Sequence, residues 1–441
     1  RFALFFPEKR PFFLEGADLF QTPIQAVYTR TITAPVWGGR VTGKEGGVRY
    51  TVLVAADAGG GSAVIPGPNG SSLASVDEGS TVVVGRAKRD LGLSFVGVIA
   101  TDREAKSGDS HNRVIGPDFQ WRPSGTDVVT GQLLFSESRT PNRPDLADEW
   151  TGQSLASHGA NASWNHSATH FDLSAQYKDF GDGFRADTGF VPQVGYHETN
   201  ASTGWTFRPN GWVTRVRTFL NSVRQTDRSG ALISRDVEPG FGMDTRWNGF
   251  MQFRYIDEDI RAGARPIGRK RFGYVAQFSP SRRVTFLSLD ATTGQEIDFD
   301  NARPGTGTTI NLQATLNPTI HVNLDLVQNQ RWVNDDAAAV SQRLFIARVS
   351  RLRGTYTFTA RLFARGIVQY VSTTRDVSLY LDPATVAREG TLSAQALLSY
   401  KLNWQSVMFL GYGDDRDRTD QNQLVQSGRQ LFLKLSYAFQ R

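Results

Sequence analysis

The chain of 441 residues contains no cysteine. Disulfide bonds, thiolate metal sites and cysteine nucleophiles are therefore excluded. The absence fits an oxidising envelope compartment, where free thiols are a hazard, although many cytosolic proteins also lack cysteine. No stretch approaches the ~18 consecutive apolar residues that a membrane-spanning helix needs, and this excludes a helical membrane protein.

The sequence also has little excess charge and no leader. Its 49 basic and 43 acidic residues give a formal net charge of +6. Because no basic helix or dense cluster of lysine and arginine is present, we expect no nucleic-acid partner. The chain begins at Arg1 without a charged-then-apolar stretch, so we expect any targeting segment to have been removed or to lie outside it.

The dominant positive feature is a strict alternation of apolar and polar residues. In one segment, Ile310, Leu312, Ala314 and Leu316 alternate with Thr309, Asn311, Gln313 and Thr315. The same period of two recurs in residues 171–178, 272–278, 320–329 and 392–402. It predicts β-strands with one apolar and one polar face. A soluble β-sandwich would alternate in the same way, so other features must separate it from a barrel in lipid.

Strand length and the placement of aromatic residues favour the barrel. The expected strands have about 10–14 residues, close to the ~9–11 residues that cross a bilayer at a tilt. Soluble strands average nearer ~5–6 residues. Aromatic residues near the expected strand ends are typical of the girdles at the two membrane interfaces. They are Trp121, Trp164, Trp205, Trp212, Trp247, Tyr370, Trp404, Tyr412 and Tyr437.

Short and long connections alternate along the chain. Short turns are expected near residues 43–46, 89–91, 123–126, 166–169, 209–211, 247–249, 279–282, 317–319, 358–361 and 403–405. Long polar loops are expected near residues 57–79, 102–112, 139–152, 179–193, 260–269, 297–306, 334–341, 376–390 and 414–428. Outer-membrane barrels have this asymmetry, because their periplasmic turns are short and their extracellular loops are long.

The sequence therefore predicts an all-β fold, a transmembrane antiparallel up-and-down β-barrel of about 22 strands, within a range of roughly 18–24. The expected location is the outer membrane of a Gram-negative bacterium, in contact with its lipid and lipopolysaccharide. Counting hairpins gives about 21 strands from Val36 to Phe439, and residues 25–33 can supply one more. The strand at residues 345–358 breaks the alternation, which predicts a β-bulge.

Residues 1–24 do not alternate, and we expect them to form a plug or linker that precedes a barrel of residues 25–441. Two prolines, Pro7 and Pro11, interrupt any regular element there. The segment could fill part of the barrel lumen, or it could be a periplasmic linker ordered against the rim. Its candidate plug residues are Glu8, Lys9, Arg10, Phe12, Phe13 and Glu15.

The run PEKRPFFLEG, residues 7–16, resembles the signature of the domain-of-unknown-function 5916 family. Four shorter stretches support the resemblance in the same order, at residues 28–30 (YTR), 38–44 (GGRVTGK), 184–190 (FRADTGF) and 362–370 (LFARGIVQY). The resemblance covers essentially the whole chain. It implies an outer-membrane barrel that follows a carbohydrate-binding module of family-9 type, so the chain is expected to be the C-terminal part of a longer protein. The family has no established biochemical role, so the resemblance indicates location better than activity.

No motif predicts catalysis, a metal or a cofactor. His166 and His170 are four residues apart but flank an expected turn, so metal-ligand geometry is not implied. Asp414, Asp415, Asp417 and Asp420 lack the glycine and the terminal glutamate of a calcium loop. Because no catalytic triad or phosphate-binding loop stands out, we expect no catalytic residue and no enzyme activity, with a barrel-embedded hydrolase as the remoter alternative.

Charged residues on the expected inward faces are the candidates for lining the lumen. They are Arg49, Arg215, Arg217, Arg254, Arg271, Arg353, Arg365, Asp118, Asp172 and Asp325. The arginines could favour anions in a water-filled pore, or they could pair with the carboxylates, including those of Glu8 and Glu15. The leading hypothesis is a channel or transporter for glycan-type or anionic solutes. The alternative is a plugged barrel that anchors a surface or periplasmic protein partner.

Overall fold

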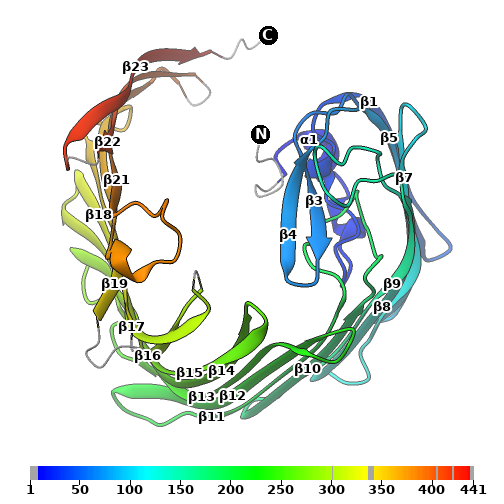
Figure 1. Cartoon of the computed structure of the whole chain (residues 1–441), viewed down its shortest axis with the longest axis horizontal. Helices are drawn as coiled ribbons and strands as arrows, with labels where there is room; N and C mark the ends of the chain where they lie inside the picture. The colour runs from blue at the N-terminus through cyan, green and yellow to red at the C-terminus, as the bar shows by residue number, and fades with distance from the viewer. Residues whose placement is uncertain (1–7, 300, 336–341, 404–405, 420–421, 438–441) are drawn as a thin grey trace. The chain divides into compact units, whose positions relative to one another are not determined.

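The computed structural model describes residues 8–299, 301–335, 342–403, 406–419 and 422–437. Two compact units divide the chain: unit 1 is Arg1–Thr203 with Asn221–Arg235, and unit 2 is Gly204–Leu220 with Asp236–Arg441. Within the described ranges, 21 strands belong to one antiparallel sheet and two form a separate hairpin (Figure 1). None of the helices described is long and apolar enough to cross a membrane.

Three short helical turns precede the strands of unit 1: α1 (Pro11–Leu14), η2 (Ala17–Phe20) and η3 (Thr29–Thr31). The strands that follow are β1 (Pro35–Glu45), β2 (Val48–Asp57), β3 (Ser62–Gly67), β4 (Gly70–Ser75), β5 (Ser80–Leu91), β6 (Ser94–Ala105), β7 (His111–Trp121), β8 (Asp127–Arg139), β9 (Ser154–Ser167) and β10 (Phe171–Phe180). Three strands contribute residues to both units: β11 (Tyr196–Phe207), β12 (Val213–Asp227) and β13 (Leu232–Thr245).

Unit 2 continues with β14 (Gly249–Ala262), β15 (Arg265–Phe278), β16 (Val284–Asp298), β17 (Arg303–Thr319), β18 (Val322–Asp335), β19 (Gln342–Thr357), β20 (Leu362–Arg375), η4 (Val377–Leu379), β21 (Arg388–Lys401), β22 (Val407–Arg418) and β23 (Leu424–Ser436). Strands that follow one another pair as antiparallel hairpins, as in β14–β15 and β22–β23. The predicted fold class, all-β and up-and-down with about 22 strands, is confirmed, since the described sheet has 21.

Each strand of unit 2 has one apolar and one polar face. The register places Phe253 opposite Tyr274, Tyr274 opposite Ala291, and Ala291 opposite Ile310 on one face. The opposite face carries polar rows, such as Asp290 opposite Asn311 and Asn311 opposite Asn329. Many of the apolar side chains are exposed, among them Phe272, Leu312, Leu326, Leu352, Leu398, Leu410, Leu431 and Leu433. An exposed apolar sheet face of this extent needs an apolar environment.

The strands of unit 1 bury the face that unit 2 leaves polar. One buried cluster joins the strands to the N-terminal segment, which here means residues 8–34, before β1. The strands contribute Leu53, Val82, Val84, Ile99, Val114 and Leu134, and the segment contributes Phe13, Phe20, Ile24, Ala26, Val27 and Ile32. The segment lies on the concave side of β1–β9 in this unit (Figure 1). On the other face, side chains such as Val98, Ile115, Phe119, Leu133 and Phe135 are exposed.

Several expectations about elements are wrong. The long loop expected at 297–306 is one of them, because β16 runs to Asp298 and β17 already begins at Arg303. Residues 25–33 form no strand, because their backbone groups form hydrogen bonds with the loop at 181–195. Tyr28 N–H donates to Thr188 O at 2.7 Å, and Phe190 N–H donates to Gln25 O at 2.9 Å. The long loop expected at 260–269 is a two-residue turn, since β14 runs to Ala262 and β15 begins at Arg265. The bulge expected within 345–358 lies just before it, where Val333 pairs with Phe345 but Asn334 pairs with Arg343.

Candidate functional site

Glu8 and Arg10 organise the described part of the N-terminal segment. The Glu8 carboxylate accepts hydrogen bonds from Arg10 Nη2 and from Thr29 Oγ1, both at 2.7 Å. Arg10 also donates to the carbonyls of Ile32 and Thr29, and its guanidinium lies 4.2 Å from the centre of the Phe13 ring. Burial alone would raise the pKa of Glu8, but the hydrogen bonds from Arg10 and Thr29 outweigh it and lower this pKa to about 2. The segment therefore folds around an internal ion pair.

The segment is held on the sheet by polar side chains that project from the buried face. Arg86 donates from Nε to Leu19 O at 3.1 Å and binds Asp118 through Nη2 at 2.8 Å, and both of these side chains are almost fully buried. The side-chain oxygen of Gln132 accepts from Ile24 N–H at 2.6 Å. These contacts position the segment by its backbone, so they do not depend on its side chains. The sequence indicated Asp118 but not its partner Arg86.

Four of the five stretches that carry the family resemblance meet in unit 1. Arg40, from GGRVTGK, forms an ion pair with Glu15 at 3.0 Å, and Gly38 leaves room for Phe12, since a Cβ there would lie 3.3 Å from the Phe12 ring. In FRADTGF, Thr188 Oγ1 donates to Ala26 O at 3.0 Å. A Cβ at Gly189 of the same stretch would overlap the backbone of residues 25 and 26. These stretches therefore supply contacts that join the N-terminal segment to β1 and to the loop at 181–195.

The candidate plug residues take different positions in this arrangement. Phe13 is buried, whereas Phe12 is 37% exposed and packs edge-on against Phe13 with ring centres 5.0 Å apart. Glu15 and Arg10 bind as described above. The side chain of Lys9 is exposed, and only its backbone N–H makes a hydrogen bond, with Glu8.

A cavity of about 170 Å³ lies in unit 1 beneath the β3–β4 hairpin and the loops at 140–153 and 181–195. Its wall combines charged groups, such as Arg103 and Glu149, with hydroxyls and the apolar side chains of Ile65 and Val191. Ser80 Oγ is buried there without a hydrogen-bond partner among the described residues. Because typical ligand sites have ~300–1,000 Å³, this cavity admits only a small polar solute.

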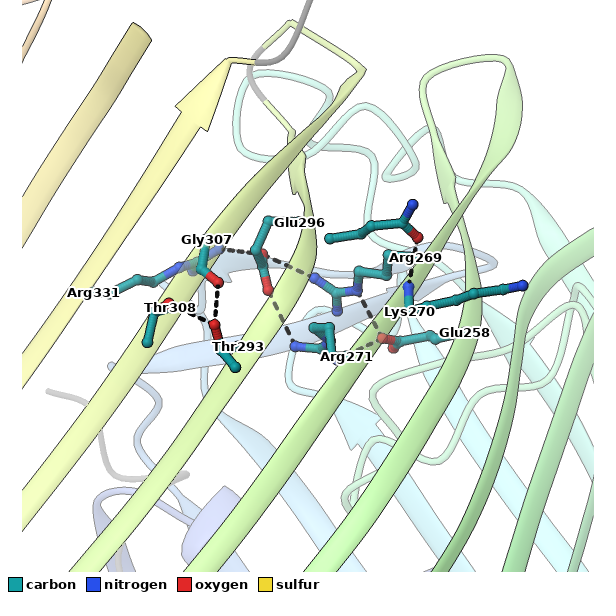
Figure 2. Close-up of polar contacts among 10 residues, drawn as sticks. Glu258, Arg269, Lys270, Arg271, Thr293, Glu296, Gly307, Thr308 and Arg331 are labelled. Atoms are coloured by element: carbon teal, nitrogen blue, oxygen red, sulfur yellow. Dashed lines mark hydrogen bonds and ion pairs between the residues drawn. The ribbon is translucent and has the colours of Figure 1, made fainter. Parts of the chain in front are cut away.

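The polar face of unit 2 carries a cluster of two carboxylates and three guanidinium groups (Figure 2). Arg269 donates to Glu258 at 2.7 Å and to Glu296 at 3.1 Å, and Arg271 bridges the same two carboxylates at 2.6 and 3.2 Å. Arg331 adds a third hydrogen bond to Glu296 at 3.0 Å. The side chain of Glu296 is 8% exposed and that of Arg331 is 42% exposed, so the cluster reaches from a buried carboxylate to an exposed guanidinium.

At least five of the seven arginines predicted to line the lumen form ion pairs with carboxylates. Arg49 pairs with Asp90, Arg215 with Asp244, Arg254 with Glu238 and Asp290, Arg271 with Glu258 and Glu296, and Arg353 with Asp325. The guanidinium of Arg217 lies 5.7 Å from the Phe219 ring. Arg365 has no ion-pair partner in the part of the chain that the structure describes. The backbone carbonyl of Asp172 accepts a hydrogen bond from Thr203 Oγ1 at 3.1 Å. The second interpretation of these arginines, that they pair with carboxylates, therefore applies to most of them.

Sequence reasoning missed Glu258, Arg269 and Glu296. Arg269 lay in the long loop wrongly expected at 260–269, and Glu296 lay next to the loop expected at 297–306. Glu258 and Glu296 lay just before these loops, where the alternation of β14 and β16 already puts both on the polar face. Only Arg269 was lost to a loop, because the start of β15 was placed too late.

The histidines and aspartates that the sequence singled out make ordinary polar contacts. His166 Nδ1 lies 2.9 Å from Asp127 Oδ1. Asp414 binds Arg416 at 2.7 Å and Arg429 at 2.9 Å, while Asp420 lies outside the described residues. No group of three or more potential metal-ligating side chains occurs in the described ranges.

No protein-family model and no curated protein sequence matches the chain. Fifteen chains of solved structures resemble it at low similarity, and two of them are siderophore receptors named PirA. The PirA structure from Acinetobacter baumannii is 10% identical, with a TM-score of 0.38 over 90% of this chain and 81% of that chain. The one from Pseudomonas aeruginosa is also 10% identical, with a TM-score of 0.43 over 88% of this chain and 73% of that chain. The ferric citrate transporter FecA is 10% identical, with a TM-score of 0.34 over 89% and 66% of the two chains.

Proposed function

We propose that the chain is an outer-membrane β-barrel that passes polar, hydroxyl-rich solutes of the glycan type. The observation that carries the proposal is the two-faced sheet of unit 2, in which exposed apolar side chains oppose rows of charged and amide side chains. In lipid, a sheet must face the hydrocarbon with an apolar surface and must satisfy its backbone hydrogen bonds within the barrel. The polar face would then line the solute path.

Aromatic side chains near the short turns support this orientation in the membrane. Trp121, Trp164 and Trp205 are 55%, 41% and 49% exposed, and each lies at or near the end of a strand that leads into a short turn. Amphipathic rings prefer the boundary between hydrocarbon and water. The short turns would therefore lie at one interface, on the periplasmic side, and the longer loops at the other.

The pairing of charges supports an uncharged solute over an anion. Carboxylates bind at least five of the seven expected lumenal arginines, so little unbalanced positive charge remains on these five to attract anions. Fixed donors and acceptors of both kinds suit hydroxyl groups, which donate and accept hydrogen bonds at once. Membership of the domain-of-unknown-function 5916 family, with its implied upstream carbohydrate-binding module, is part of this proposal.

Reconstitution of the full chain into liposomes tests the proposal. We expect neutral oligosaccharides to enter the liposomes at rates that fall with oligosaccharide length, and we expect measurable conductance in planar bilayers. A chain that inserts into lipid but shows neither permeation nor conductance would contradict the transport function. The mechanism contains no covalent step, so hydrolysis of glycans or esters by the purified chain would also contradict it.

A second candidate is a plugged barrel that anchors a surface or periplasmic protein, and the docking of the N-terminal segment supports it. Six apolar side chains of the segment are buried in the core of unit 1. Disulfide locking separates the candidates, because a Cβ at Gly183 would lie 3.6 Å from the Ser157 Cβ, within disulfide range. In the cysteine-free chain, the Gly183→Cys/Ser157→Cys pair would fix the loop that holds residues 25–28.

Conductance of this variant is compared in oxidised and reduced states, with the Gly183→Cys single variant as the control for the substitution. Conductance that disappears on oxidation would indicate that the segment must move for transport. Conductance that is equal in both states would indicate a path beside a fixed segment. A chain that conducts in neither state, and that co-purifies with a protein partner from native membranes, would favour the anchor.

A further inference from the structure

Three arginines on the apolar face of unit 2 have no carboxylate partner in the ranges that the structure describes. They are Arg348 on β19, Arg388 at the start of β21 and Arg418 at the end of β22. Arg348 and Arg388 are exposed, and the guanidinium of Arg418 lies 5.8 Å from the Tyr370 ring. Arg418 Nε is buried without a hydrogen-bond acceptor. Arg388 and Arg418 lie at the loop-side ends of their strands, and Arg348 lies in the loop-side half of β19.

Strand alternation places these arginines on the same face as the apolar side chains. Arg348 is four residues from Leu352 on β19, Arg388 is four residues from Leu392 on β21, and both separations are even. A residue two or four positions along a strand points to the same side of the sheet. The arginines therefore continue the apolar face toward the loops and do not belong to the polar face.

The register brings the three arginines close together. Arg348 pairs with Ser372, Ser372 pairs with Gly390, and Thr391 pairs with Asp417, the neighbour of Arg418. With strands ~4.8 Å apart and a rise of ~3.4 Å per residue, the three Cα atoms lie within about 8–14 Å of each other. Arg416 and Arg429 lie on the same face and share Asp414. The patch formed by Arg348, Arg388, Arg416, Arg418 and Arg429 is thus strongly cationic.

We infer that this patch binds the phosphate groups of a lipid headgroup in the outer leaflet, the bisphosphorylated lipid A portion of lipopolysaccharide. The inference rests on the proposed membrane-spanning function, which places the apolar face in hydrocarbon and the patch at headgroup level on the loop side. Guanidinium groups bind phosphate in a bidentate manner, and basic residues at the membrane surface attract anionic headgroups. Two phosphates on one headgroup match the five arginines of the patch, which are spread over β19, β21, β22 and β23.

The neighbouring strands show that the patch is local. At the corresponding loop-side positions, the same face carries Asp257, Asp259 and Arg261 on β14 and Lys270 on β15, so the charges there are balanced. On β17 and β18 it carries the uncharged Thr306, Thr308, Gln328 and Gln330. Among β14–β23, the stretch β19–β23 gathers the five arginines of the patch around a single carboxylate, that of Asp414, so we expect a preferred headgroup position there.

The test measures binding of lipid A to the full chain in detergent micelles by native mass spectrometry. The variant Arg348→Gln/Arg388→Gln removes two exposed arginines of the patch. The variant Arg351→Gln/Arg365→Gln is the matched control, because it removes the same charge from the polar face of β19 and β20. With about 1 kcal/mol for each arginine at the surface, the patch variant should bind lipid A roughly 10- to 30-fold more weakly. The control should bind like the unchanged chain.

Equal binding by the unchanged chain and the patch variant would overturn the inference, and so would equal weakening by the control. The unchanged chain should also prefer bisphosphorylated lipid A over its dephosphorylated form and over phosphatidylethanolamine; equal binding of all three lipids would reduce the contact to a hydrophobic one. Flotation of the chain with liposomes tests membrane insertion separately. A chain that fails to insert but still prefers phosphorylated lipid A would count against the proposed function and not against the patch.

Discussion

Unit 1 and unit 2 use equivalent sheet faces in opposite ways. In unit 1, the face of β2 and β5–β8 carries aliphatic side chains and is covered by the N-terminal segment. In unit 2, the corresponding alternation carries glutamate, aspartate, arginine and asparagine, which pair with one another across the strands. Alternation alone therefore does not determine what a face contacts. The residue types on this face, aliphatic in unit 1 and charged or amide-bearing in unit 2, indicate whether the chain covers the face or leaves it exposed to water.

The difference also determines where a buried charge can occur. On the covered face, Arg86 and Asp118 are buried together, and Arg86 donates both to Asp118 and to Leu19 O of the segment. On the open face, guanidinium and carboxylate groups form networks that stay partly hydrated, as Arg331 does. We expect substitutions on the covered face to affect stability most, and substitutions on the open face to affect ion selectivity most.

Arg86→Leu should give the largest effect. It leaves the Asp118 carboxylate buried without its partner, which costs about 3–5 kcal/mol of unfolding free energy. Urea unfolding of the full chain in micelles, followed by tryptophan fluorescence, measures the loss. The double variant Arg86→Leu/Asp118→Leu should recover part of it, because no charge remains buried. A loss below ~1 kcal/mol in the single variant would show that the covered face admits water.

Glu296→Gln should have the next largest effect, on the open face. The glutamine weakens three charge-assisted hydrogen bonds and leaves Arg269, Arg271 and Arg331 with excess positive charge, so we expect a loss of about 1.5–3 kcal/mol. The reversal potential in a salt gradient should also shift toward anions. The control is Glu389→Gln, which removes the same charge from a 54% exposed partner of Arg375. An equal shift in both variants would indicate a general charge effect with no special role for the cluster.

Lowering the pH should loosen the N-terminal segment without unfolding the sheet. The folded pKa of Glu8 is about 2, below the ordinary value of 4.5, so its contribution is present above pH 4.5 and is lost as the pH falls toward 2. Hydrogen exchange at Thr31 and Ile32, corrected for intrinsic rates, should accelerate roughly 10- to 100-fold over that window. In Glu8→Gln the acceleration should already be present at neutral pH. An unchanged pH profile in that variant would assign the effect to another group.

Arg215→Gln should have the smallest effect. Arg215 binds Asp244 at 2.6 Å, but the two side chains are 45% and 34% exposed. Exposed ion pairs contribute about 0–1 kcal/mol, so the urea midpoint should move little. A loss as large as that of Arg86→Leu would contradict the distinction between a covered and an open face.

The sequence predicted the fold class well because a period of two is a direct consequence of strand geometry. It predicted Asp325 and Arg353 on one face, and the register places them opposite each other. It failed for residues 25–33, whose composition allows a strand but whose backbone partners come from residues near Thr188. Hydrogen-bond partners so distant in the sequence produce no recognisable pattern in the residues around 25–33. The Glu258–Glu296 cluster was missed for a different reason, because Arg269, which joins the two carboxylates, lies at a polar strand end that resembles a loop.

The docking of the N-terminal segment has a consequence for the order of assembly. Its hydrogen bonds to Gln132, Asn161 and Thr188 join residues that are 108 to 162 positions apart. The segment precedes these partners in the chain, so it acquires its place only after β8, β9 and the loop after β10 exist. Closing such long loops is slow, and meanwhile Leu53, Val84, Ile99 and Leu134 remain uncovered. An envelope chaperone that shields this face until the segment docks would match the hazard that such exposed intermediates present.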